Sequence, residues 1–134
     1  MMAHLATRSR IPLTDPRFNL REVVKQMVLL EDHLAHPTKR CPDCIRKHLL
    51  TIEGYAEEAL SLDRRGAYRT LAAGLAEAAR HWMEALESGG GHEAVGQQVR
   101  FLRKRLVPKV CDPREEARRL ASTYLAGVLE CRSG

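Results

Sequence analysis

Residues 31–50, EDHLAHPTKRCPDCIRKHLL, decide the fold because they hold the turn between two segments with helical periodicity. Apolar residues before the turn recur at spacings of three and four, which places them on one helical stripe: Leu20, Val23, Met27, Leu30 and Leu34. After the turn the same pattern joins Ile45, Leu49, Ile52, Ala56 and Ala59. Pro37 ends the first segment, and Pro42 suits the first turn of the second, where its missing amide hydrogen is not needed. The sequence therefore predicts an antiparallel hairpin of two helices.

The rest of the chain repeats the helical pattern. We expect the first helix to start at Asn19, whose side chain caps it while Glu22 completes a capping box. Further apolar stripes predict three more helices, over about residues 67–87, 95–106 and 113–131. Three glycines, 89–91, follow the first of these, and Pro108 is expected to stop the second. Since no segment alternates like a strand, the predicted fold is all-α, a single-domain bundle of about five helices.

The N-terminal region differs from this bundle. Residues 1–18 carry Arg8, Arg10 and Arg17 with two prolines and no apolar period, so we expect an extended basic arm, and the bundle domain over 19–134. A length of 134 residues suits one domain. The net charge of +5 allows contact with nucleic acid or acidic partners without selecting either.

The chain shows no targeting or membrane segment. No apolar run approaches the roughly 18 residues needed to cross a bilayer, and the first residues lack the apolar core of a secretory signal. We therefore expect a cytoplasmic protein without a membrane partner. Its four cysteines should be reduced there, so that a C-x-x-C pair points to metal binding or catalysis.

Five metal-binding or redox-capable side chains crowd around the predicted turn: His33, His36, Cys41, Cys44 and His48. Cys44 follows Cys41 by three residues and precedes His48 by four, so these three side chains lie on one face of the second helix. In an antiparallel hairpin, the end of the first helix, with His33 and His36, lies beside this face. Zinc takes four thiolate or imidazole ligands in a tetrahedron. The sequence thus predicts zinc bound by Cys41, Cys44, His48 and His33, with His36 as the substitute for His33.

Two other interpretations of this cluster stay open. Cys41 at a helix N-terminus can be an attacking thiolate, with Cys44 as the resolving thiol and His48 as the proton carrier. Alternatively, Cys41 is a small core filler, His48 is bonded to a carbonyl, and His33 and His36 are solvated.

Two resemblances accompany these motifs. The spacing C-x-x-C-x-x-x-H, here Cys41, Cys44 and His48, is similar to that of the alkylhydroperoxidase-D and carboxymuconolactone decarboxylase family, which implies an all-helical fold and thiol chemistry. The stretch CPDCIRKHLLTIEGYAEEALSLD, followed by RRGAYRTLAAGLAEAARHWMEAL, resembles small, mostly uncharacterised helical proteins of phage and prophage type. That likeness implies a viral or mobile-element context, with incorporation in a virus particle or a role in assembly.

A row of basic residues, which we call the basic ridge, indicates a third possible function, nucleic-acid binding. Arg100, Arg103 and Lys104 on one predicted helix, with Arg118 on the next, are positioned to bind phosphates. A solvated helix face explains such a run equally well. The leading expectation is a non-enzymatic structural or assembly protein that binds a protein partner or itself; a thiol-dependent oxidoreductase and a nucleic-acid-binding protein are the alternatives. The sequence identifies no small-molecule substrate.

Overall fold

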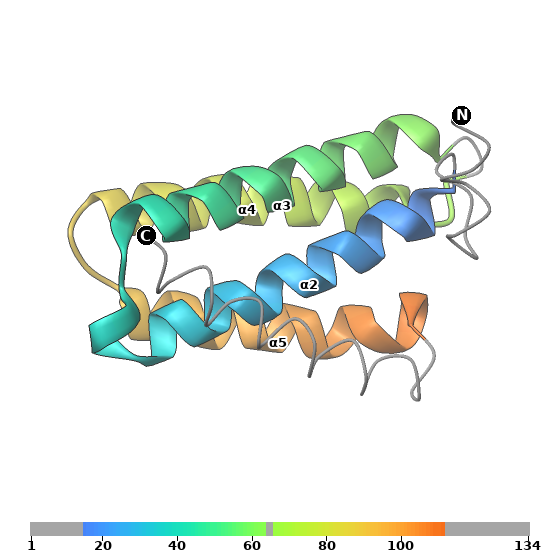
Figure 1. Ribbon diagram of the computed structural model, residues 1–134. Coiled ribbons are helices and arrows are strands. Elements are labelled where there is room, and N and C mark those ends of the chain that lie inside the picture. The colour runs from blue at the N-terminus through green and yellow to red at the C-terminus, as the bar shows by residue number, and fades with distance from the viewer. Residues whose placement is uncertain (1–14, 64–65, 112–134) are drawn as a thin grey trace, which may run out of the picture.

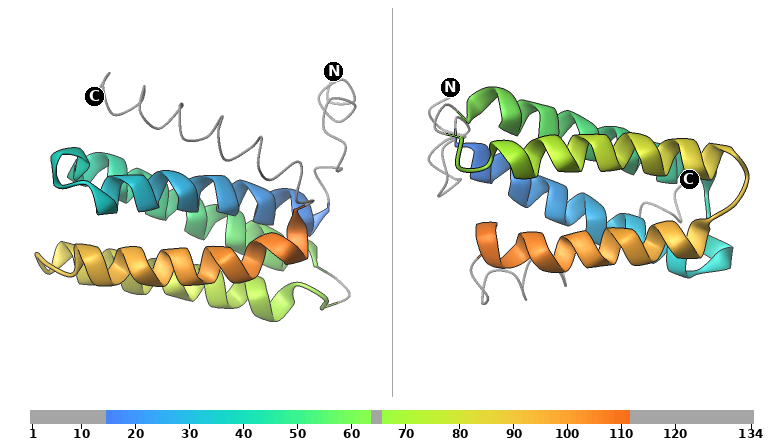
Figure 2. Two further views of the ribbon diagram at one scale, coloured as in Figure 1. Left: turned by 90° about the horizontal axis from the view of Figure 1, so that it is seen from below. Right: turned by 180° about the vertical axis from the view of Figure 1, so that it is seen from behind.

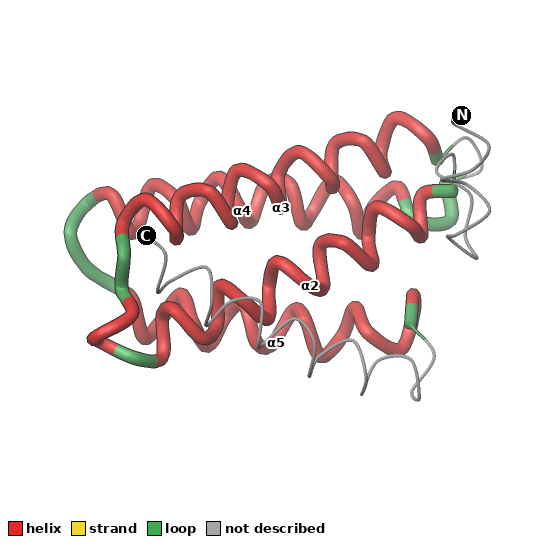
Figure 3. The backbone as a smooth tube through the Cα atoms, viewed as in Figure 1, coloured by secondary structure: helices red, strands yellow, loops and turns green. Residues whose placement is uncertain are grey.

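The computed structural model describes residues 15–63 and 66–111. These residues form four α-helices and one short 3-10 turn (Figure 1): α2 (Pro16–Ala35), η1 (Pro37–Lys39), α3 (Pro42–Leu62), α4 (Arg69–Glu87) and α5 (His92–Val110). The described part of the chain contains no strand, as Figure 3 shows, which confirms the all-helical prediction. The helix predicted over 113–131 and residues 1–14 of the predicted arm lie outside the described residues.

The four helices run up and down, each antiparallel to the next (Figure 2). α2 packs against both α3 and α5, and α3 packs against α4, while α4 and α5 make little contact with each other. The end of α2, the start of α3 and the connection from α4 to α5 all lie at one end of the bundle. The candidate site is at this end.

The predicted hairpin is confirmed. α3 begins at Pro42, as expected, and α2 ends at Ala35, before Pro37. All ten apolar residues of the two stripes are buried: Leu20, Val23, Met27, Leu30, Leu34, Ile45, Leu49, Ile52, Ala56 and Ala59. They join Trp82 of α4 and Val99 of α5 in one core. The apolar period of α2 and α3 therefore sets the centre of the bundle.

The start of α2 differs from the prediction. The helix begins at Pro16 with Asp15 as its cap, and the Asp15 carboxylate accepts a hydrogen bond from the Arg17 amide at 2.9 Å. Asn19 is instead a buried residue inside the helix. Asp followed by Pro starts a helix earlier because Asp satisfies a free amide and Pro has the helical φ already. Residues 15–18 therefore belong to the helix and its cap.

The end of α5 also differs. The helix does not stop before Pro108 but continues through it to Val110. Pro108 is exposed, whereas Leu106 and Val110 on the inner face are buried. The carbonyl that loses its hydrogen bond at Pro108 is that of Lys104, four residues earlier, and Lys104 is exposed, so that water can replace the lost amide. Burial of Val110 thus outweighs the break in the hydrogen-bond ladder.

None of the described helices combines the length and the apolar composition that crossing a bilayer requires.

Two neighbouring leucines on α3 test the orientation of this helix. Leu49 is 1% exposed and Leu50 is 46% exposed. We expect Leu49→Ala to lower the free energy of unfolding by about 2–5 kcal/mol, because it leaves a cavity in the core. Leu50→Ala should change it by less than about 0.5 kcal/mol. Urea unfolding followed by circular dichroism measures both, and equal effects would contradict the placement of α3.

Candidate functional site

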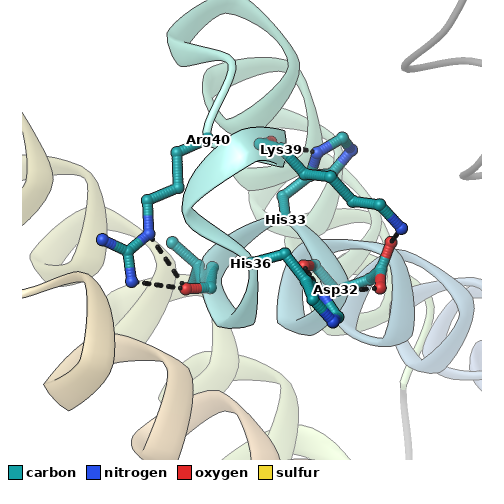
Figure 4. A network of polar contacts seen from close by, with 6 residues as sticks. Asp32, His33, His36, Lys39 and Arg40 are labelled. Atoms are coloured by element: carbon teal, nitrogen blue, oxygen red, sulfur yellow. Dashed lines mark hydrogen bonds and ion pairs between the residues drawn. The ribbon is translucent and has the colours of Figure 1, made fainter.

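The corner between α2 and α3 is held by side chains that bond to backbone ends (Figure 4). Arg40 donates from Nε and Nη2 to the carbonyl of Leu34, at 3.1 and 3.0 Å. This guanidinium satisfies a carbonyl left free at the end of α2 and suits the negative end of its dipole. The ammonium group of Lys39 pairs with the buried carboxylate of Asp32 at 3.1 Å. These contacts fix how the chain turns from α2 through η1 into α3.

Two histidines meet beneath this corner. His33 of α2 is 1% exposed and His48 of α3 is 2% exposed. Their ring centroids are 5.2 Å apart and the ring planes are tilted by 31°. The interpretation in which His33 is solvated is therefore wrong. Imidazole is rarely buried in an apolar core unless its polar atoms are used, so the pair requires a chemical explanation.

The hydrogen bonds of the pair indicate which nitrogen of each ring carries a hydrogen. His33 Nδ1 lies 2.8 Å from the Lys39 carbonyl oxygen, and His48 Nδ1 lies 2.7 Å from Gln26 Oε1. Because both partners are oxygen acceptors, each Nδ1 carries the hydrogen and donates it, and in a neutral ring Nε2 then holds the lone pair. His33 Nε2 is buried and has no hydrogen-bond partner among the described residues.

His36 has different surroundings from His33. Its side chain is 50% exposed, and Nδ1 lies 3.2 Å from Asp32 Oδ1 and 3.0 Å from the Asp32 carbonyl oxygen. Figure 4 shows His36 beside Asp32, apart from the His33 ring. Of the two histidines considered for the fourth ligand position, the structure places His33 against His48.

The two cysteines sit at the start of α3. Cys41 is the N-cap residue, and Cys44 lies in the first turn. Both are reduced and half-buried. The pKa of the Cys41 thiol is lowered, chiefly because the backbone amide of Cys44, and then its thiol, donate hydrogen bonds to the Cys41 thiolate. The backbone amide of Asp43 lowers this pKa further. Burial of the thiol and the negative charge of the Asp43 carboxylate raise it, but they do not cancel the lowering. The Cys41 thiol therefore ionises more readily than an ordinary cysteine thiol.

The four predicted zinc ligands are brought to one corner but not into one cluster. His33 contacts His48, Cys41 neighbours Cys44, and Cys44 lies one turn from His48 on the same face of α3. Within residues 15–63 and 66–111, no three His, Cys, Asp or Glu side chains are grouped closely enough to hold a metal ion. The arrangement is thus two adjacent pairs, one of imidazoles and one of thiols.

Sequence reasoning missed two groups that shape the site. Gln26 binds His48 from the neighbouring helix, and the backbone carbonyl of Lys39 binds His33. Gln26 precedes His33 by seven residues, which places both on one face of α2, so its position beside the histidines could have been inferred. The position of the Lys39 carbonyl depends on the path of η1, which no pattern in the sequence predicts.

A cavity of about 400 Å³ lies beside the first turn of α3. Its lining is mainly apolar, from residues such as Ile45, Leu49 and Met83, with Arg46 and His92 among the polar residues. Pro42 and Asp43, the two residues between the cysteines, also line it. A molecule held in this cavity would lie next to the C-x-x-C segment.

The predicted basic ridge is only partly described. Arg103 pairs with Glu31 of α2, from Nε to Oε2 and from Nη2 to Oε1, so its charge is largely neutralised. Arg100 and Lys104 are exposed on α5. Arg118 lies outside the described residues. Phosphate binding by these groups stays a prediction.

The pKa of Cys41 can be tested by alkylation. In a Cys111→Ser/Cys131→Ser background, iodoacetamide should modify Cys41 at lower pH than it modifies an unfolded peptide of the same sequence. Adding Cys44→Ala removes the second thiol but keeps the amide, so the midpoint for Cys41 should move part of the way back up. Mass spectrometry of samples quenched across a pH series gives both midpoints. A midpoint for Cys41 equal to the peptide value would contradict the geometry of this turn.

Comparisons of the chain with protein-family models, with curated proteins and with solved structures find no match. The assignment of a function therefore rests on the residues and the geometry described above.

Proposed function

We propose that this chain is a non-enzymatic structural or assembly module whose α2–α3 corner binds zinc through Cys41, Cys44, His48 and His33. The observation that carries the proposal is the buried pair His33 and His48, each with Nδ1 bonded to an oxygen acceptor. A histidine that binds a metal commonly donates the N–H of its other ring nitrogen to an oxygen acceptor such as a backbone carbonyl, which fixes the tautomer and orients the ligating nitrogen. His33 Nε2 is buried without a hydrogen-bond partner among the described residues, and a metal ion would satisfy it.

The thiols supply the other half of the ligand set. Zinc binds deprotonated sulfur, and the surroundings of Cys41 already favour its thiolate. Since the four donors are not clustered among the described residues, binding requires the η1 segment and the first turn of α3 to close toward the imidazoles. The energy of metal binding would then stabilise the hairpin directly.

Zinc binding predicts a specific pattern of variants. Native mass spectrometry should find about one zinc per chain. A free zinc concentration of one hundred times Kd should add about 2.7 kcal/mol to the free energy of unfolding, seen as a raised Tm. Cys41→Ser/Cys44→Ser should abolish the bound zinc, whereas Cys111→Ser should keep it.

His33→Asn provides the sharper control. The Asn side-chain NH₂ group can still donate to the Lys39 carbonyl from the position of His33 Nδ1. Asn has no nitrogen atom at the position of Nε2 and therefore cannot bind the metal there. This variant should fold without zinc and should lose at least about tenfold in zinc affinity. Folded wild-type protein that takes up no zinc would remove the proposal.

A thiol-dependent oxidoreductase is the second candidate, favoured by the lowered pKa of Cys41. The Cys41 thiolate would attack the O–O bond of a peroxide, forming a sulfenic acid and releasing the alcohol or water. The Cys44 thiol would then displace water to form the disulfide, so that two electrons pass to the peroxide. An external dithiol must reduce the disulfide. His48 suits a proton carrier poorly, because it is 2% exposed.

Peroxide consumption with dithiothreitol as the reductant tests this candidate. Cys41→Ser should abolish turnover while the circular dichroism spectrum is unchanged, and Cys44→Ser should leave a sulfenic acid that dimedone traps. The rate of peroxide consumption with the wild-type protein must exceed the rate with dithiothreitol and no protein. If both serine variants retain the wild-type rate, the C-x-x-C pair is not an active site.

A further inference from the structure

α4 and α5 leave an open groove between them. Although they are consecutive, they pack against α3 and α2 respectively and make little contact with each other. The groove has a volume of about 540 Å³, and Ala78, Trp82 and Leu102 are among its lining residues. Small side chains such as Ala78 and Ala94 let another backbone approach closely. This face of the bundle is concave and mainly apolar.

A large hydrophobic side chain stands at the edge of the groove. Phe101 of α5 is 59% exposed, and Leu50 of α3 is the other large hydrophobic residue exposed among those described. The guanidinium carbon of Arg105 lies 5.4 Å from the centre of the Phe101 ring. Phe101 also lines the groove. A projection and a hollow therefore lie side by side on one face, as a self-complementary interface requires.

Two polar side chains that line the groove, Trp82 and Gln98, are paired with each other. The indole nitrogen of Trp82 donates to Gln98 Oε1 at 2.9 Å, which links α4 to α5. This bond also sets the relative height of the two antiparallel helices. Glu77, five residues before Trp82, is therefore level with residue 103, five residues after Gln98, and close in height to Lys104 and Arg105.

The charges on the two sides of the groove are opposite. Glu77 on α4 is exposed, and so are Lys104 and Arg105 on α5. A two-fold axis parallel to the groove would lay α4 of each copy over α5 of the other at unchanged height. The acidic side of one molecule would then face the basic side of its partner, twice in each dimer.

We propose that this groove binds a second copy of the same chain, with Phe101 of each copy seated in the groove of the other. Each of the two helices has 19 residues, so the face is about 28 Å long and about 20 Å wide, or roughly 560 Å² per copy. Stable dimers bury about 800 Å² per partner. The area is below that value, which suits a reversible dimer rather than a permanent one.

Two matched variants test the interface. Sedimentation equilibrium of the full chain over about 1–300 µM should show a monomer–dimer equilibrium. Phe101→Asp should weaken it at least about tenfold. Leu50→Asp, an equivalent change at the other exposed hydrophobic residue, should leave it unchanged. Chelation of zinc should not dissociate the dimer, so this test is independent of the proposed metal site.

A charge exchange identifies the partner as a second copy in this orientation. Glu77→Lys alone and Arg105→Glu alone should each weaken self-association, because like charges then face each other. Mixing the two variants should restore a heterodimer, because opposite charges again face each other at both contacts between positions 77 and 105. A chain that stays monomeric throughout overturns the proposal. A dimer that is weakened more by Leu50→Asp than by Phe101→Asp also overturns it. If Phe101→Asp lowers the Tm without changing self-association, the proposal is again wrong, because another segment of the same chain would then occupy the groove.

Discussion

The hydrogen bond from His33 Nδ1 to the Lys39 carbonyl is the contact on which the site depends. It joins a buried side chain of α2 to the backbone just before α3, so it sets where the chain re-enters the bundle. A buried imidazole and a backbone carbonyl are both costly to leave without partners. Their bond favours one path of the turn over others of similar length. The position of Cys41, two residues beyond Lys39, follows from that path.

The same corner brings three kinds of chemistry within a few residues. The imidazole pair is buried between α2 and α3, the thiols begin α3, and the cavity lies on the side of α3 that faces Met83 of α4. The segment from Cys41 to Cys44 contains both thiols and also contributes to the lining of the cavity. A change in the first turn of α3 is therefore expected to alter thiol ionisation and cavity shape together, whereas a change at Gln26 removes a hydrogen-bond partner of His48.

The sequence predicted the hairpin well because apolar periodicity and two prolines agree. It failed where two local signals compete. Asn19 with Glu22 has the form of a capping box, but Asp15 with Pro16 starts the helix a turn earlier. Pro108 predicts a stop, but burial of Val110 continues the helix. At the site, the sequence identified the residue types but not which histidine lies against His48. The bond that holds His33 goes to a backbone carbonyl of η1, and neither this bond nor the Arg40 and Lys39 side-chain contacts of the turn follow a periodic pattern.

The two candidate functions make different demands on the same residues. A dithiol site needs a readily ionised thiol with a second thiol beside it, and the half-buried pair Cys41 and Cys44 meets that need without any histidine. It gives no reason for two imidazoles to be buried in contact, with His33 Nε2 lacking a partner among the described residues. The proposed zinc would account for the imidazoles and the thiolate together, but it would require a closing motion at the corner. The burial of His33 is therefore the feature that favours zinc over thiol catalysis.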